Sequence, residues 1–134
     1  MSVPVIVALY SPYDEKDPRH WSIYLEVAPP GPTVMLEVLD DNGAKGYHVG
    51  EPRLDTPPER TSKHYKSVNV GSIASGNFDM AVAAMKDTPC DNESKTWNCQ
   101  AWVVEALDGL AEAGLFEWEE GKRDEILELR EDWQ

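Results

Sequence analysis

Residues 98–115, NCQAWVVEALDGLAEAGL, carry the clearest helical pattern in the chain. Apolar side chains recur three and four positions apart, the spacing of one buried helix face, at Cys99, Trp102, Val103, Ala106, Leu107 and Leu110. Asn98 is a favourable residue to cap the start of this helix, and Gly114 is placed to end it. The pattern therefore predicts an amphipathic helix with Cys99 in its first turn, on the face that packs against the rest of the protein.

The chain before this helix has the alternating pattern of strands. We expect strands at residues 5–10, 20–27, 33–40 and 64–73, with the DDNG turn at 40–43 folding the third strand back into KGYHVGE at 45–51. Residues 52–62 are expected to form a surface loop, and residues 76–86 and 119–133 two further helices. Strands followed by helices predict an α+β fold, an antiparallel sheet followed by packed helices, in a single domain over residues 1–134.

The charge balance limits the partners that the protein can have. Its 134 residues include 12 Lys and Arg against 25 Asp and Glu, a formal net charge of −13. Nucleic acids and anionic membranes bind basic surfaces, so we expect neither as a partner. The first residues have no secretory signal pattern, and no run approaches the roughly 20 apolar residues of a membrane span. We expect a cytoplasmic protein with free thiols; a secreted effector is the alternative.

Cys99 has three interpretations on position alone. It could be a buried structural thiol, half of a disulfide with Cys90, or a nucleophile. The amide groups and dipole of the first helical turn favour the thiolate over the thiol, which supports the third interpretation. Cys90 lies in TPCDNE without an activating neighbour, so we treat it as a bystander. Two cysteines and three scattered histidines lack the spacing of a zinc site, so we expect no metal and no cofactor.

A cysteine nucleophile needs a base, and His20 is the candidate among the histidines. In HWSIYL (20–25), Trp21, Ile23 and Leu25 alternate on one face, and His20 lies on the other face at the start of the strand. If the strand at 33–40 pairs beside it, Glu37 could orient the imidazole. The alternative for Glu37 is a solvated strand carboxylate. His48 and His64 are interpreted as solvent-facing or satisfied residues.

HWSIYL and NCQAWVVEAL together resemble motifs of the circularly permuted papain-like thiol enzymes. This group includes the lecithin:retinol acyltransferase family, with HWALY and NCEHF motifs, and relatives of the NlpC-type peptidases. The chain is most similar to small fungal proteins that carry an NCQ-W-V motif. In this group the histidine strand precedes the cysteine helix, and the same order occurs here. The resemblance implies a permuted papain-like (NlpC-type) fold, with His20 as general base and Cys99 as nucleophile.

The resemblance further implies a cysteine-dependent hydrolase or acyltransferase that forms a thioester acyl-enzyme on an amide or ester. The acyltransferases usually have a second histidine where Glu37 falls, so Glu37 either replaces it as third catalytic member or signals lost catalysis. Trp21, Trp97 and Gln100 are assigned to substrate binding, although core packing explains the tryptophans equally well. No anchor pattern is present, so a small-molecule or peptide substrate fits better than a lipid.

The C-terminal part of the chain is acidic, a pattern typical of a solvated helical face. An apolar stripe within it should pack on the body of the protein or on a second subunit of a homodimer; its members are Ile126, Leu127, Leu129 and Trp133. The functional alternative to the enzyme is a catalytically inactive binding or interaction module, such as an effector, on the same fold.

Overall fold

The sheet is the centre of the protein. The computed structural model describes residues 2–11, 19–28, 33–40, 47–55, 57–91 and 98–130. Six strands form an antiparallel sheet in the order β6-β3-β2-β1-β7-β8. Their bounds are β1 Ser2–Tyr10, β2 His20–Leu25, β3 Val34–Leu36, β6 Arg53–Leu54, β7 His64–Ala74 and β8 Glu117–Trp118. A second, two-stranded sheet pairs β4 (Val38–Asp40) with β5 (Tyr47–Val49).

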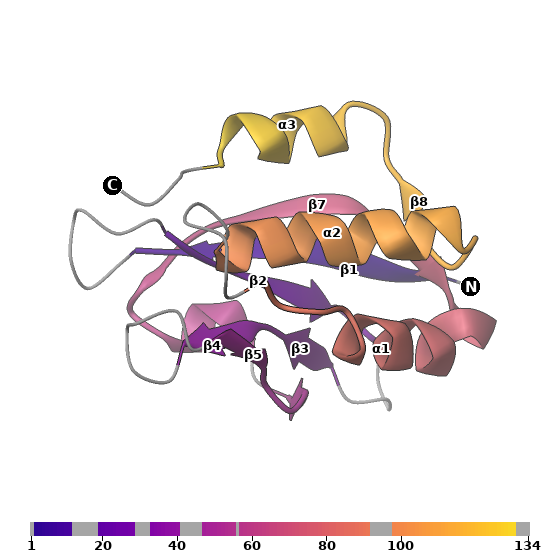
Figure 1. The fold of residues 1–134 in the computed structure, drawn as a ribbon, viewed down its shortest axis with the longest axis horizontal. Helices are drawn as coiled ribbons and strands as arrows, with labels where there is room; N and C mark the ends of the chain where they lie inside the picture. Colours follow the sequence, from indigo (N-terminus) through magenta and orange to yellow (C-terminus); the bar gives the residue numbers. More distant parts are fainter. Residues whose placement is uncertain are drawn as a thin grey trace.

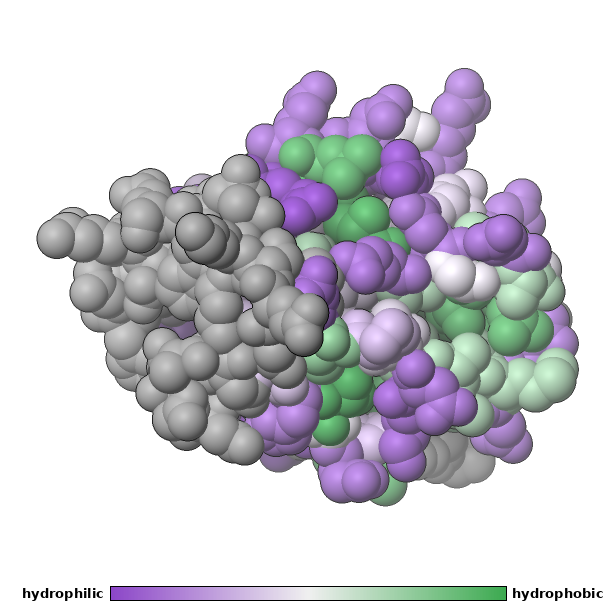
Figure 2. Space-filling view, in the orientation of Figure 1, coloured by the Kyte–Doolittle hydropathy of each residue, from purple (hydrophilic) through white to green (hydrophobic). Residues whose placement is uncertain are grey.

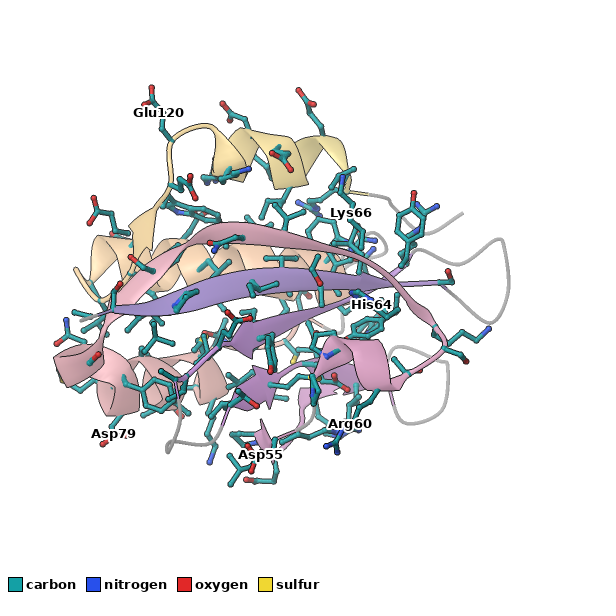
Figure 3. The ribbon with its side chains drawn as sticks, turned by 180° about the vertical axis from the view of Figure 1, so that it is seen from behind. Asp55, Arg60, His64, Lys66, Asp79 and Glu120 are labelled. Atoms are coloured by element: carbon teal, nitrogen blue, oxygen red, sulfur yellow. The ribbon has the colours of Figure 1, made fainter. Side chains whose placement is uncertain are left out.

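Three helices of the described residues pack against the six-stranded sheet. They are α1 (Phe78–Lys86), α2 (Cys99–Glu112) and α3 (Lys122–Glu128), with short 3-10 turns at Pro58–Arg60 and Ser75–Asn77. In Figure 1, α2 lies in front of the strands with α1 next to it, and from behind, in Figure 3, the strands lie in front of α2. Helix α3 lies beside β7 (Figure 1). The α+β class with a mostly antiparallel sheet is therefore confirmed.

Helix α2 begins and ends where its sequence predicts. Asn98 Oδ1 accepts hydrogen bonds from the amides of Gln100 at 3.0 Å and Ala101 at 3.3 Å, which caps the first turn. At the other end Gly114 adopts a left-handed conformation, with φ 77°. The amide of the following Leu115 then reaches back to the carbonyl of Leu110 at 2.8 Å, the bond that defines a Schellman ending. Both ends of the helix are therefore set by local sequence.

Several elements differ from the sequence-based expectation. The strand expected at 33–40 is interrupted at Glu37, so that β3 belongs to the large sheet and β4 to the small one. The expected hairpin with residues 45–51 does form, as β4 paired with β5, although its turn lies outside the described residues. The expected loop at 52–62 contains the edge strand β6, and β8 forms the opposite edge. Helix α3 is shorter than the predicted 119–133.

The core lies between the large sheet and α2. Trp21, Ile23 and Leu25 on β2 are fully buried, and Trp102 and Leu107 meet them from α2. Burial of this many large side chains is the main stabilising contribution to such a domain. The indole Nε1 of Trp102 donates to the carbonyl of Thr88 at 3.1 Å, which ties α2 to the segment after α1. The predicted amphipathic face of α2 is therefore the face that packs on the sheet.

The apolar stripe of α3 packs on the body of the protein. Ile126 is fully buried, and Leu127 and Leu129 pack against the same core. Trp133, the last member of the predicted stripe, lies outside the described residues. On the face shown in Figure 2, hydrophilic side chains predominate along α3, with hydrophobic ones in small groups between them. Within the described residues, none of the helices has both the length and the apolar character that crossing a membrane requires.

Candidate active site

Three separate parts of the chain meet at one end of the sheet: the start of β2, the break between β3 and β4, and the start of α2. Tyr24 pairs with Met35 in the antiparallel β2–β3 ladder. Two residues further along, Glu37 reaches the same face as His20 and becomes its diagonal neighbour. The structure brings Glu37 Oε2 to 3.6 Å from His20 Nε2. The strand pairing on which Glu37 was predicted to meet His20 is therefore present.

Hydrogen bonds from the start of α2 to the carbonyl of Arg19, the residue before His20, hold Cys99 beside the imidazole. The side-chain amide of Gln100 donates to the carbonyl of Arg19 at 2.8 Å, and Cys99 Sγ lies 3.9 Å from the same oxygen. Cys99 is the first residue of α2 and is 9% exposed. The start of α2 is thus fixed against the start of β2, with the thiol next to the imidazole.

The environment of His20 favours its charged form. Burial opposes protonation, but hydrogen bonding and charge interactions with Cys99 and Glu37 outweigh it and raise the pKa of His20 from 6.5 to about 10. The His20 side chain keeps 33% of its surface open to solvent, whereas that of Glu37 keeps 11%. Burial by itself would raise the pKa of Glu37, but His20 and the guanidinium of Arg53 lower it. At neutral pH the pair is therefore an imidazolium and a carboxylate.

Tyr10 supports the imidazole from the neighbouring strand. Tyr10 pairs directly with His20 across β1 and β2, and the two ring centroids are 5.5 Å apart. The Tyr10 hydroxyl is fixed in turn by Ser22 Oγ at 3.0 Å. His64 lies on the far side of Tyr10, with ring centroids 6.0 Å apart, and its Nε2 is 2.9 Å from Ser67 Oγ. His64 is thus separated from Cys99 by Tyr10, while His20 is beside it.

The helix start offers one particular backbone donor to a substrate. Asn98 Oδ1 already accepts from the amides of Gln100 and Ala101. The amide of Cys99 itself is not used by this cap. An oxyanion that forms on a carbon attached to Cys99 Sγ would lie near this amide. Of the amides at residues 99–101, the Cys99 N–H is therefore the one that we expect to donate a hydrogen bond to the oxyanion.

Two of the residues that the sequence assigns to substrate binding, Trp21 and Gln100, are buried inside the protein. Trp21 is fully buried in the core, and its Nε1 has no hydrogen-bond partner among the residues that the structure describes. Gln100 is also fully buried and bonds the Arg19 carbonyl. The structure assigns both to packing and to positioning of α2, because neither presents surface to solvent. Trp97 lies outside the described residues.

Cys90 and His48 take no part in the site around Cys99. Cys90 and Cys99 are both free, so the disulfide interpretation does not hold in this structure. His48 is exposed to solvent on β5, where it pairs with Leu39 of β4. Within the described ranges, no group of three His, Cys, Asp or Glu side chains is arranged to hold a metal ion.

One charged residue of this site escaped the sequence analysis. Arg53 Nη2 lies 3.7 Å from Glu37 Oε1, on the opposite side of the carboxylate from His20. It belongs to the two-residue strand β6, inside a stretch that reads as a proline-containing loop. Its role follows from pairing with β3, which has no local sequence signal, so only a three-dimensional structure brings it to the site.

Comparison with known families adds one finding. A sequence profile described as a family of unknown function (DUF6540) matches residues 7–117, a span that contains Cys99, His20 and Glu37. No curated protein and no solved structure matches the chain.

Proposed function

The chain belongs to this family of unknown function, and we propose that it is a cysteine-dependent hydrolase or acyltransferase acting on an amide or ester of a small molecule or peptide. One observation carries the proposal: Cys99, His20 and Glu37 converge from three distant parts of the sequence, with Glu37 Oε2 3.6 Å from His20 Nε2. A nucleophile, a base and a group that orients the base are the parts that acyl transfer requires.

The first half-reaction acylates the thiol. His20 already holds its proton at neutral pH, so Cys99 attacks the substrate carbonyl carbon as the thiolate of an ion pair, and the carbonyl oxygen becomes an oxyanion beside the Cys99 amide. When this intermediate collapses, the bond to the leaving amine or alcohol breaks, and His20 gives its proton to that group. The product that stays on the enzyme is a thioester of Cys99.

The second half-reaction releases the acyl group. His20 accepts a proton from water or from an acceptor amine, which attacks the thioester carbonyl. The carbon–sulfur bond breaks and Cys99 leaves as the thiolate, which regains its ion pair with the protonated His20. Water gives hydrolysis and an amine gives acyl transfer. Glu37 stabilises the imidazolium in both steps and touches neither substrate nor acceptor.

The permuted papain-like fold belongs to the same proposal. The support is the order of the parts along the chain, since His20 opens a strand of an antiparallel sheet and Cys99 opens a later helix packed on that sheet. A cytoplasmic location and a homodimer likewise remain proposals.

Thiol alkylation tests the proposed nucleophile directly. In a Cys90→Ser background, iodoacetamide should label Cys99 at neutral pH faster than it labels free cysteine. His20→Ala should slow labelling by about a hundredfold, in the range found for the loss of an acid–base group. His64→Ala is the matched control, because His64 contacts Tyr10 but is not a partner of Cys99, and it should leave the rate unchanged. Labelling of the folded protein at or below the rate of free cysteine would refute the proposal.

A second candidate function is a catalytically inactive binding module. It is favoured by the burial of Cys99, which is 9% exposed, and by Glu37 at the position where the similar acyltransferases have a histidine. This candidate predicts an intact fold in which Cys99 reacts only after urea unfolds the chain, and in which His20→Ala changes nothing. The two candidates are therefore separated by the same alkylation assay.

A further inference from the structure

The sheet register places Arg53 in line with the Cys99 site. Arg53 pairs with Met35 across β6 and β3. Glu37 is two residues beyond Met35, on the same face, so Arg53 and Glu37 are diagonal neighbours in the way that Glu37 and His20 are. Three charged side chains on three adjacent positions of the sheet, His20, Glu37 and Arg53, thus form one row. The pairing of β2, β3 and β6 brings these side chains close together, with Glu37 directly after the end of β3.

The Glu37 carboxylate has a different cation at each oxygen. Oε2 lies 3.6 Å from His20 Nε2, and Oε1 lies 3.7 Å from Arg53 Nη2. The Glu37 side chain is 11% exposed, so water contributes little to holding it. The Arg53 side chain is 55% exposed and reaches the carboxylate from the outside. Rotation of the carboxylate would move at least one of its oxygens away from the cation that it faces.

We propose that Arg53 is a positioning residue of the Cys99 site, which holds the outer oxygen of Glu37 so that the inner oxygen stays against His20. The inference rests on the proposed function, because it assigns Arg53 a part in preparing the base of that reaction. Arg53 acts through Glu37 and does not touch the reacting atoms.

Loss of Arg53 has two effects on His20, and their signs are opposite. Removing a nearby positive charge by itself favours the imidazolium and raises the pH at which His20 titrates. Releasing Glu37 from its fixed orientation removes a stabilising carboxylate and lowers that pH. The ionisable groups around His20 and Glu37 in the described residues are Cys99 from α2, Tyr10 from β1 and Arg53 from β6. Only Arg53 changes in the comparison, so the sign of the shift separates positioning from charge.

The experiment is an NMR titration of the His20 imidazole in full-length wild type, Arg53→Met, Arg53→Lys and Arg123→Met. Arg123→Met is the matched control, since it removes an arginine–carboxylate pair, with Asp108, from α2 and α3. We expect the His20 midpoint to move down by about one pH unit in Arg53→Met. Arg53→Lys, which keeps the charge on a differently shaped side chain, should fall between wild type and Arg53→Met. Arg123→Met should match wild type.

The inference is overturned if the His20 midpoint is unchanged or moves up in Arg53→Met while circular dichroism shows that the variant is folded, because Glu37 then keeps its orientation without Arg53. This result is distinct from failure of the proposed function, which would appear as slow alkylation of wild-type Cys99 whatever the titration of His20 does.

Discussion

A carboxylate is paired with cations near each end of α2, but the two carboxylates differ in their exposure to water. At its start, Glu37 is buried between His20 and Arg53, with ion contacts of 3.6 and 3.7 Å. At its other end, Asp108 forms a bidentate pair with Arg123 of α3, with bonds of 2.8 and 2.7 Å between side chains that are 37% and 45% exposed. The contacts at the exposed end are the shorter ones. Yet the buried end is where a histidine becomes a stable cation, with its pKa raised to about 10.

The length of an ion contact is therefore a poor measure of how strongly it affects the charge state of a neighbouring group. Water screens the Arg123–Asp108 pair, so its good geometry contributes little beyond holding two helices together. At the Cys99 end water is largely absent from Glu37, and each charge depends on its neighbours for stabilisation. Changes at the two ends should therefore separate into effects on stability alone and effects on the chemistry of the thiol.

The largest stability effect is expected away from Cys99, at Gly71 of β7. A Cβ at this position would lie 2.1 Å from the backbone oxygen of Glu117 in β8 and 2.8 Å from the Phe116 ring. Gly71→Ala should lower the free energy of unfolding in urea by about 2 to 3 kcal/mol, because β8 must move away. Gly109→Ala is the control, since nothing lies within 4 Å of the added carbon and alanine favours a helix. Wild-type stability of Gly71→Ala would contradict the close approach of β7 and β8.

The next largest effect is expected at the buried end, in Glu37→Gln. This change keeps the shape of the side chain but removes the charge that stabilises the imidazolium. Alkylation of Cys99 should slow by about tenfold, equivalent to about 1.4 kcal/mol. Glu51→Gln is a suitable control, because Glu51 is 89% exposed and pairs with Lys86. Equal rates in the two variants would remove Glu37 from the site.

Stability should depend on pH through the same buried pair. The pKa of His20 is raised from 6.5 to about 10, so its stabilising effect is complete below about 6.5 and is lost as the pH rises towards 10. Glu37 has the opposite sign: its pKa is lowered from 4.5, so its contribution is complete above 4.5 and is lost as the pH falls further. Urea unfolding measured from acid to alkaline pH should show both limbs in wild type, and His20→Gln should lack the alkaline one.

Loss of the cap at either end of α2 should lower the free energy of unfolding by about the same amount. The two losses should differ in their effect on the rate of Cys99 alkylation. Asn98→Ala loses the acceptor for two amides, and Gly114→Ala forces alanine into a left-handed conformation with φ 77°. Each should lower stability by about 1 kcal/mol. Only Asn98→Ala should also slow Cys99 alkylation, since it loosens the turn that carries the thiol. Asn98→Asp, which keeps an acceptor, should restore stability.

The smallest effect is expected for Arg123→Met at the exposed end. Its bidentate pair is largely solvated, so the free energy of unfolding should fall by less than about 1 kcal/mol. Cys99 alkylation should be unchanged. If the free energy of unfolding falls as far as in Gly71→Ala, the Arg123–Asp108 pair contributes more to the attachment of α3 than the burial of Ile126 does.

Local patterns predicted the long elements well. Strands β1, β2 and β7 and helix α2 form close to where alternation or helical spacing placed them, because burial of one face decides each of them. Strands β6 and β8 were not predicted, since two residues at a sheet edge have no period of their own. The break at Glu37 was also missed, because it depends on which strand each half of 33–40 pairs with.

The residues of the candidate site differ in the same way: some have a local sequence pattern, and others depend on strand pairing. Motifs point to Cys99 and His20 as candidates, and Glu37 follows from the prediction that the strands at 20–27 and 33–40 pair, as β2 and β3 do. Arg53 could not be identified, because its position depends on an unpredicted strand. Trp21 was assigned to substrate because aromatic side chains suit both pockets and cores, and only burial in the folded chain separates the two.

The bond from Gln100 to the Arg19 carbonyl joins residues 81 positions apart. His20 and Cys99 therefore meet only when these two distant segments have packed together. If Cys99 is activated as proposed, a nascent or damaged chain carries only an ordinary thiol. The reactive group would then be switched on by completion of the fold, so that the cell is not exposed to an acylating cysteine on an unfinished protein.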